Sequence, residues 1–163
     1  MGARMNTKAI EGHSSEPWNE VVRAEVGHVF YDAINEGVRI VVMRGPSHLC
    51  AYLGVPEAHP LAGFGYDDIP LDCHGGLTFG KAGDSLLAKG WFWYGWDYGH
   101  SGDYCTYYDK EPLSKRPRDE KKWTVEEVTQ EAIFACYDFR RLMKLAEKCS
   151  LKESGFQIAR KQS

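Results

Sequence analysis

The feature that most constrains the fold is a run of β-branched residues bounded on both sides by turn residues. Val38-Arg39-Ile40-Val41-Val42-Met43 follows Gly37 and is followed by Gly45-Pro46. β-Branched side chains favour an extended backbone, and glycine and proline interrupt regular structure, so this run predicts a buried strand. Residues 48–55 are its predicted hairpin partner, and the two strands must therefore run antiparallel.

Two further strands and one early helix are predicted from the spacing of apolar residues. The strand candidates are Leu77-Thr78-Phe79 and the aromatic run Trp91-Phe92-Trp93-Tyr94-Gly95-Trp96. Apolar positions between residues 18 and 36 recur at helical spacing and predict an amphipathic helix. Gly37 is expected to end that helix, because glycine adopts the left-handed conformation common just after a helix.

A second helix is predicted to begin after Thr124, which forms a capping box with Glu127 and precedes a long apolar stripe. The predicted fold is α+β, a two-layer sandwich of about four mainly antiparallel strands with two flanking helices. A chain of 163 residues is the size of one domain, so we expect a single domain over 1–163. Within it we expect a loose arm at 1–14, an exposed loop at 109–122 and a solvated tail at 150–163.

Composition excludes several classes of protein. A formal net charge of -3 supplies no basic field, so binding to duplex nucleic acid is not expected. No apolar run approaches the roughly 20 residues that span a bilayer, so a membrane protein is not expected either. The 5 cysteines are an odd number without a C-x-x-C pair, and no secretory segment is recognised, which favours reduced thiols in the cytoplasm.

Polar residues gather beside two of the predicted strands. His74-Gly75-Gly76 precedes the strand at 77–79, and Asp97, His100 and Asp103 follow the strand at 91–96. The loop at 56–76 that leads into the first stretch contains three prolines and four glycines and has no period, which is typical of a functional loop. If the two strands pair, their edges converge and bring His74, Asp97, His100 and Asp103 together.

Three interpretations of this constellation stay open. His74, Asp97, His100 and Asp103 offer the nitrogen and oxygen ligands that zinc, manganese or iron prefers. Alternatively, the amides of Gly75-Gly76 form an anion site in which His74 and Thr78 donate to a phosphate and Trp93 or Tyr52 stacks on a base. In the third interpretation the histidines and aspartates only cap turns and strand ends. His28 and His48 are interpreted as structural residues inside predicted elements.

Four segments carry a further pattern, at 53–60, 66–68, 73–79 and 95–103. The most specific parts are His-Gly-Gly-Leu-Thr-Phe at 74–79 and Gly-x-Asp-x-x-His-x-Gly-Asp at 95–103. Together these segments resemble a family of small bacteriophage and prophage proteins. The resemblance implies a phage accessory protein in the cytoplasm of a bacterial host, with a role against host defence.

From that context we expect a protein that binds and sequesters a small nucleotide-type ligand, such as an immune second messenger, without a cofactor. A homodimer or higher oligomer is expected to build such a site. The expected ligand-binding residues are Asp67, Asp68, His74, Gly75, Gly76, Thr78, Trp93, Asp97, His100 and Asp103.

The alternative expectation is a metal-dependent hydrolase of a nucleotide or another phosphodiester. His74, Asp97, His100 and Asp103 would then hold a divalent metal, and Asp68 or His59 would serve as the general base. A third expectation is an inhibitor that binds a host protein through exposed aromatic side chains.

Overall fold

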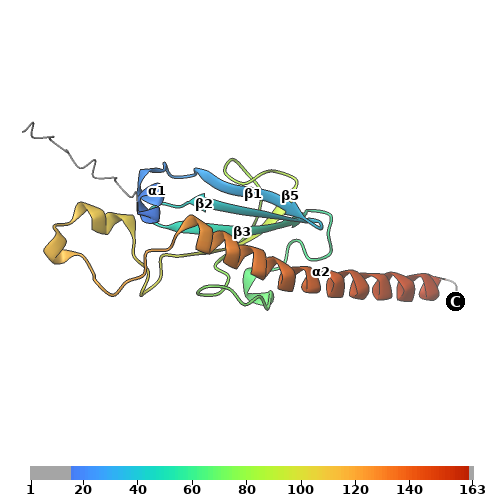
Figure 1. The fold of residues 1–163 in the computed structure, drawn as a ribbon. Helices are drawn as coiled ribbons and strands as arrows, with labels where there is room; N and C mark the ends of the chain where they lie inside the picture. Colours follow the sequence, from blue (N-terminus) through green and yellow to red (C-terminus); the bar gives the residue numbers. More distant parts are fainter. Residues whose placement is uncertain (1–15, 162–163) are drawn as a thin grey trace, which may run out of the picture.

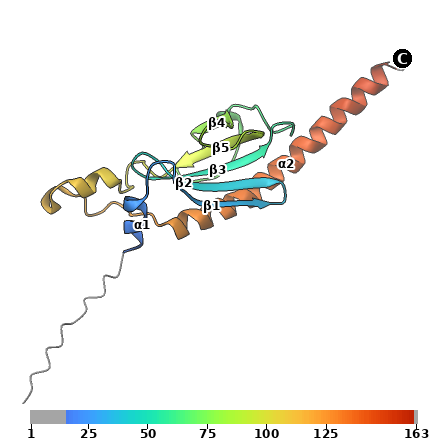
Figure 2. The same ribbon diagram turned by 90° about the horizontal axis from the view of Figure 1, so that it is seen from above.

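The computed structural model describes the backbone of residues 16–161 and the side chains of residues 16–153. A single antiparallel sheet of five strands has the order β1-β2-β3-β5-β4, and the long helix α2 lies across one of its faces (Figures 1 and 2). The helices are α1 (Pro17–Arg23) and α2 (Val125–Lys161). The strands are β1 (Val29–Asn35), β2 (Val38–Arg44), β3 (Leu49–Pro56), β4 (Phe79–Ala82) and β5 (Trp91–Asp97). The predicted α+β fold is confirmed, with one strand more than expected.

The hairpin predicted from the β-branched run forms as expected. β2 pairs antiparallel with β3, from Arg39 opposite Gly54 to Arg44 opposite Leu49. β3 in turn pairs with β5, and β4 pairs with the other edge of β5. The two strands that flank the histidine-bearing stretches are therefore neighbours in the sheet.

The helix predicted over 18–36 is wrong for most of its length. Only α1 is helical, and β1 follows it and pairs with β2. Glu36 and Gly37 both have positive φ, 45° and 86°, and form the two-residue turn between these strands. Positive φ at both positions suits the twist of a tight hairpin, so Gly37 serves a strand turn and not a helix end. Pairing with β2 outweighs the helical spacing of the apolar residues.

The main core lies between the sheet and α2. Alternate residues of the central strands point toward the helix, among them Ile40, Leu53 and Tyr94, and they pack against Ala132 and Phe139. The opposite face of the sheet carries a smaller cluster around Trp93, which the loop containing Leu87 covers. Each central strand thus buries side chains on both faces, which explains the continuous apolar run in β2.

The helix α2 begins as predicted and ends later than predicted. Its capping box forms, with the Thr124 amide donating to Glu127 Oε2 at 3.0 Å and the Glu127 amide donating to Thr124 Oγ1 at 3.2 Å. The tail expected at 150–163 is helical as far as Lys161. Among the described residues, neither helix contains a stretch long and apolar enough to cross a bilayer.

Two long connections leave the sheet and meet beside the first turn of α2. One joins β3 to β4 and contains the short 3-10 helix η1 (Tyr66–Asp68), and the other joins β5 to α2 and contains η2 (Thr106–Lys110) and η3 (Leu113–Lys115). Residues 109–122, expected as an exposed loop, lie in the second connection and are mostly exposed. The expected loose arm at 1–14 lies outside the described residues.

Candidate functional site

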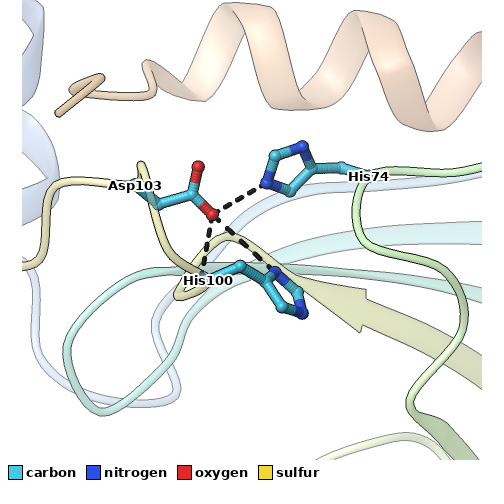
Figure 3. Close-up of side chains that lie close together, drawn as sticks. All are labelled: His74, His100 and Asp103. Carbon is cyan, nitrogen blue, oxygen red and sulfur yellow. Dashed lines mark hydrogen bonds and ion pairs between the residues drawn. The ribbon is translucent and has the colours of Figure 1, made fainter.

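Asp103 is the centre of the polar cluster where these connections meet. Its side chain is 4% exposed. Oδ2 accepts hydrogen bonds from His74 Nε2 at 2.8 Å and from the His100 amide at 3.0 Å, and Oδ1 accepts one from Trp123 Nε1 at 2.8 Å (Figure 3 shows the two histidines). Burial alone would raise the pKa of Asp103, but these hydrogen bonds outweigh it and lower the pKa. The buried carboxylate is therefore ionised at neutral pH.

Backbone hydrogen bonds fix the position of Asp103. The Asp103 amide donates to the His100 carbonyl at 2.9 Å, closing a turn in which Gly102 has a φ of 94°. The segment after Asp103 is tied to the segment before Trp123, because the Tyr104 amide donates to the Lys121 carbonyl at 2.8 Å. This short ladder holds the carboxylate beside Trp123, just before α2 begins.

His74 is held by aromatic contacts as well as by Asp103. Its ring stacks on Tyr98 with centroids 4.7 Å apart and planes 3° apart. The Tyr98 hydroxyl donates to Glu131 Oε2 on α2 at 2.6 Å. Burial and this hydrogen bond raise the pKa of Tyr98, so the phenol keeps its proton. The other ring nitrogen of His74 points away from Asp103 (Figure 3).

His100 completes the cluster with a nitrogen that lacks a hydrogen-bond partner. Its Nδ1 is buried and unpaired, although it lies 3.7 Å from Asp97 Oδ1 and 3.7 Å from Asp103 Oδ2. Gly75 makes room for this ring, because a Cβ on Gly75 would lie 2.5 Å from His100 Cε1. An imidazole nitrogen that is buried without a partner is costly, and a bound cation would satisfy it.

The structure brings three of the predicted metal ligands into one group. One nitrogen from each of His74 and His100 and one oxygen of Asp103 lie within 4.8 Å of one another. Two imidazoles and one carboxylate form a donor set that suits zinc, manganese or iron. Asp97, the fourth predicted ligand, lies at the edge of this group and accepts a hydrogen bond from the Gly99 amide at 2.9 Å.

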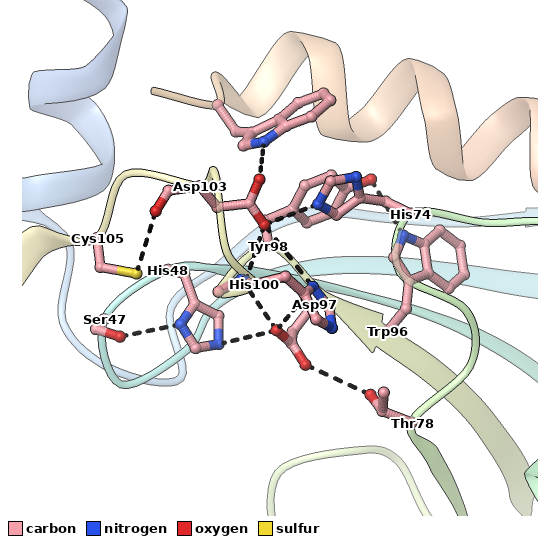
Figure 4. A network of polar contacts seen from close by, with 12 residues as sticks. Ser47, His48, His74, Thr78, Trp96, Asp97, Tyr98, His100, Asp103 and Cys105 are labelled. Carbon is pink, nitrogen blue, oxygen red and sulfur yellow. Dashed lines mark hydrogen bonds and ion pairs between the residues drawn. The ribbon is translucent and has the colours of Figure 1, made fainter. Parts of the chain in front are cut away.

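His48 is a member of the site that the sequence did not reveal. Its Nε2 lies 3.7 Å from Asp97 Oδ1, and its Nδ1 contacts Ser47 Oγ at 3.0 Å (Figure 4). A Cβ on Gly99 would lie 2.5 Å from His48 Nδ1, so this glycine makes room for the ring. Burial lowers the pKa of His48. The sequence shows only that His48 lies just before β3. In the folded sheet Cys50 of β3 lies opposite Asp97 of β5, and this register brings His48 close to Asp97.

Of the residues expected to bind a nucleotide, His74, Thr78, Asp97, His100 and Asp103 come together, but the expected aromatic platform and free amide donors do not join them. Trp93 is wrong as a stacking platform, because it is 0% exposed on the opposite side of the sheet and donates to the Ala88 carbonyl at 3.0 Å. The Gly76 amide already donates to the Cys73 carbonyl at 2.9 Å. Thr78 Oγ1 lies in the polar network and donates to Asp97 Oδ2 at 3.4 Å (Figure 4). A phosphate would therefore meet few free donors here.

The expected general bases lie outside the cluster. Asp68 is exposed in η1, as is Asp67, which was expected to bind the ligand. His59 Nε2 contacts Glu147 Oε1 at 2.9 Å, and His59 Nδ1 accepts from the Leu61 amide at 3.0 Å. Both ring nitrogens of His59 are thus used: Nε2 ties the β3–β4 connection to α2, and Nδ1 holds a turn within that connection.

A groove of about 530 Å³ lies beside His74, between residues 72–74 and α2. Its other lining residues are Asp72, Cys73, Trp96, Glu131, Phe134, Ala135, Tyr137 and Asp138. Burial raises the pKa of the Cys73 thiol to about 12, so this thiol is protonated at neutral pH and is a poor nucleophile. The groove gives a small molecule a route to the edge of the cluster.

Comparisons with protein-family models, with curated proteins and with solved structures find no match to this chain.

Proposed function

We propose that the protein is a metal-dependent hydrolase whose metal ion is held by His74, His100 and Asp103. The observation that carries the proposal is the buried Nδ1 of His100, which has no hydrogen-bond partner and faces two carboxylates at 3.7 Å. A divalent cation among these groups would satisfy the nitrogen and balance the charge of Asp103. Its binding would release to solvent the proton through which His74 Nε2 bonds to Asp103 Oδ2. Hydrolysis is the chemistry proposed, because three protein ligands leave room for a water molecule on the metal.

The metal would lower the pKa of a bound water and so supply a nucleophile at neutral pH. The protein's own residues orient the ligands. Asp103 is fixed by Trp123 and the backbone of His100, and His74 is fixed by the ring of Tyr98. Such outer contacts raise metal affinity because the ligands do not need to be reordered on binding.

Asp97 and His48 are the groups placed to handle protons. Asp97 is tied to the backbone through the Gly99 amide, and His48 lies beside it. Because burial lowers the pKa of His48, its ring is neutral near pH 7 and can accept a proton. In this proposal these two residues replace His59 and Asp68 as candidates for the general base.

Sequestration of a nucleotide is less well supported than hydrolysis. It requires an aromatic platform and free amide donors, whereas Trp93 is buried elsewhere and the Gly76 amide is engaged. Hydrolysis requires converging ligands and a neighbouring base. The grouping of His74, His100 and Asp103 supports the first need, and His48 beside Asp97 supports the second. The phosphodiester substrate expected for a hydrolase stays a prediction.

The test is an assay on chelator-stripped protein with and without added Mn²⁺ or Zn²⁺. Bis(4-nitrophenyl) phosphate and 4-nitrophenyl acetate serve as chromogenic probes for phosphodiester and carboxyl-ester hydrolysis. We expect turnover of one probe that depends on the metal and falls by at least about 100-fold in His100→Ala, since a ligand matters more than its outer contacts.

His59→Ala is the matched control, because it also removes an imidazole that contacts a carboxylate. It should retain turnover within about twofold. Turnover that survives chelation, or that His100→Ala and His59→Ala reduce equally, would contradict the proposal.

A further inference from the structure

The groove beside His74 has an unusual combination of exposed aromatic rings and carboxylates. Phe134 and Tyr137 on α2 are 69% and 50% exposed, although large aromatic side chains are usually buried. Trp96 contributes a third ring to the lining. Phe134 and Tyr137 are three residues apart on α2 and so share one side of the helix, which lines the groove. Trp96 lies in β5 and is only 2% exposed, so the exposed aromatic surface comes from the two α2 rings.

The charged groups of the groove all have the same sign. Asp72, Glu131 and Asp138 line it, and no lysine or arginine belongs to the lining. Glu131 accepts the hydrogen bond from Tyr98, and Asp138 contacts the exposed Arg141 at 3.5 Å on the helix surface. Arg140 lies 5.8 Å from the centre of the Tyr137 ring but does not line the groove. Within the lining, the three carboxylates favour a cationic group over an anionic one.

Aromatic faces and carboxylates together recognise organic cations. The negative face of an aromatic ring attracts an ammonium or guanidinium group, and a carboxylate accepts its hydrogen bonds. A metal ion alone would gain nothing from the rings, and a neutral apolar molecule would gain nothing from the carboxylates. An organic cation uses both kinds of lining.

We propose that the groove binds a small organic cation, bearing an alkylammonium or guanidinium group, and presents it to the His74 cluster. This inference rests on the proposed function, because it names the substrate class of that site. The groove volume of about 530 Å³ accommodates a small molecule. The cationic group lies between the carboxylates and the rings, and the bond to be hydrolysed lies toward His74.

The test is isothermal titration calorimetry of chelator-stripped protein with spermidine at low salt. Metal-free protein separates this binding from hydrolysis, so either proposal can fail without the other. We expect Phe134→Ala to weaken spermidine binding about fivefold, since a cation contact with an exposed ring is lost. Asp72→Asn combined with Asp138→Asn should weaken it about fivefold to tenfold, and added salt should weaken binding to the wild-type protein.

Leu145→Ala and Glu126→Gln are matched controls on α2, at exposed positions outside the groove. Both should bind spermidine within about twofold of the wild-type protein. ATP, an anion, should not bind at the same concentration. The proposal is overturned if spermidine does not bind, if ATP binds equally well, or if the groove variants behave like the controls. It is also overturned if a capped lysine-containing peptide binds and spermidine does not, because the occupant is then a protein segment.

Discussion

Two histidine–carboxylate pairs of nearly equal length occupy different parts of the molecule. His74 lies 2.8 Å from Asp103, and His59 lies 2.9 Å from Glu147. Asp103 is 4% exposed and accepts three hydrogen bonds, whereas Glu147 is 51% exposed. The nitrogen–oxygen distance therefore does not distinguish the two pairs.

The two pairs differ in whether the nearby imidazole nitrogens have hydrogen-bond partners. His59 uses both ring nitrogens, one on Glu147 and one on the Leu61 amide, so nothing is left for a ligand. Beside His74, the buried Nδ1 of His100 faces two carboxylates without a partner. Both ring nitrogens of His59 have a protein partner, whereas the cluster around Asp103 contains a buried nitrogen without one. A buried polar atom without a partner is uncommon in native proteins, and this atom is what sets the Asp103 cluster apart from the His59 pair.

The largest expected effect comes from removing the carboxylate of Asp103. Asp103→Ala leaves His74, Trp123 and the His100 amide without their acceptor, so the free energy of unfolding should fall by about 3–5 kcal/mol. Urea unfolding followed by circular dichroism measures this loss. A loss below about 1 kcal/mol would mean that Asp103 does not organise the site.

Added metal should stabilise the protein through the cluster around Asp103 and not through the His59–Glu147 pair. At 100 times its dissociation constant, Mn²⁺ should add about 2.7 kcal/mol to the stability of the wild-type protein. His100→Ala should abolish this gain, and His59→Ala should keep it. Thermal unfolding with and without Mn²⁺ measures the gain, and an equal gain in both variants would break the distinction between the two pairs.

His48 should make the free energy of unfolding depend on pH. Burial lowers the pKa of His48 below its ordinary value of 6.5, so the unfolded chain binds this proton more tightly than the folded chain. Its contribution to stability is therefore full above pH 6.5 and is lost as the pH falls toward the folded pKa. In urea unfolding at pH 7.5 and 5.5, His48→Gln should show a smaller loss than the wild-type protein, and an equal loss would count against a buried neutral His48.

The smallest effect is expected at the exposed pair. Glu147→Gln should change the free energy of unfolding by less than about 1 kcal/mol, because Glu147 is half exposed and the amide oxygen still accepts a hydrogen bond from His59 Nε2. Urea unfolding measures this change, which is compared with the loss in the free energy of unfolding caused by Asp103→Ala. A loss of several kcal/mol here would show that exposure does not distinguish the two pairs.

Local patterns predicted β2, β3 and β5 well and the early helix badly. The strand expected at 77–79 overlaps β4 only at Phe79. The β-branched run and the aromatic run have flanking turn residues that fix their limits, and β2 and β5 form close to where they were expected. Residues 29–35 carry helical spacing but also valine, phenylalanine and tyrosine, which pair readily with β2. That outcome depends on a neighbouring strand, so no local pattern decides it.

The candidate site was predicted only in part, because some of its residues come together only when distant segments of the chain pack. His74, His100 and Asp103 converge as expected because β4 and β5 are adjacent. Trp93 alternates onto the opposite face of β5, which the strand period implies once the inward residues are known. His48 and Trp123 join the site from other segments, and only the folded chain brings those segments to Asp97 and Asp103.

The most direct test of the metal centre is equilibrium dialysis of chelator-stripped protein against Mn²⁺, with bound metal counted per chain. Manganese is chosen because it prefers oxygen and nitrogen ligands to the free cysteine thiols. The wild-type protein and His59→Ala should each bind one ion per chain, and His100→Ala should bind none at the same free concentration. Equal binding by all three proteins, or no binding by the wild-type protein, would contradict a metal centre at His74, His100 and Asp103.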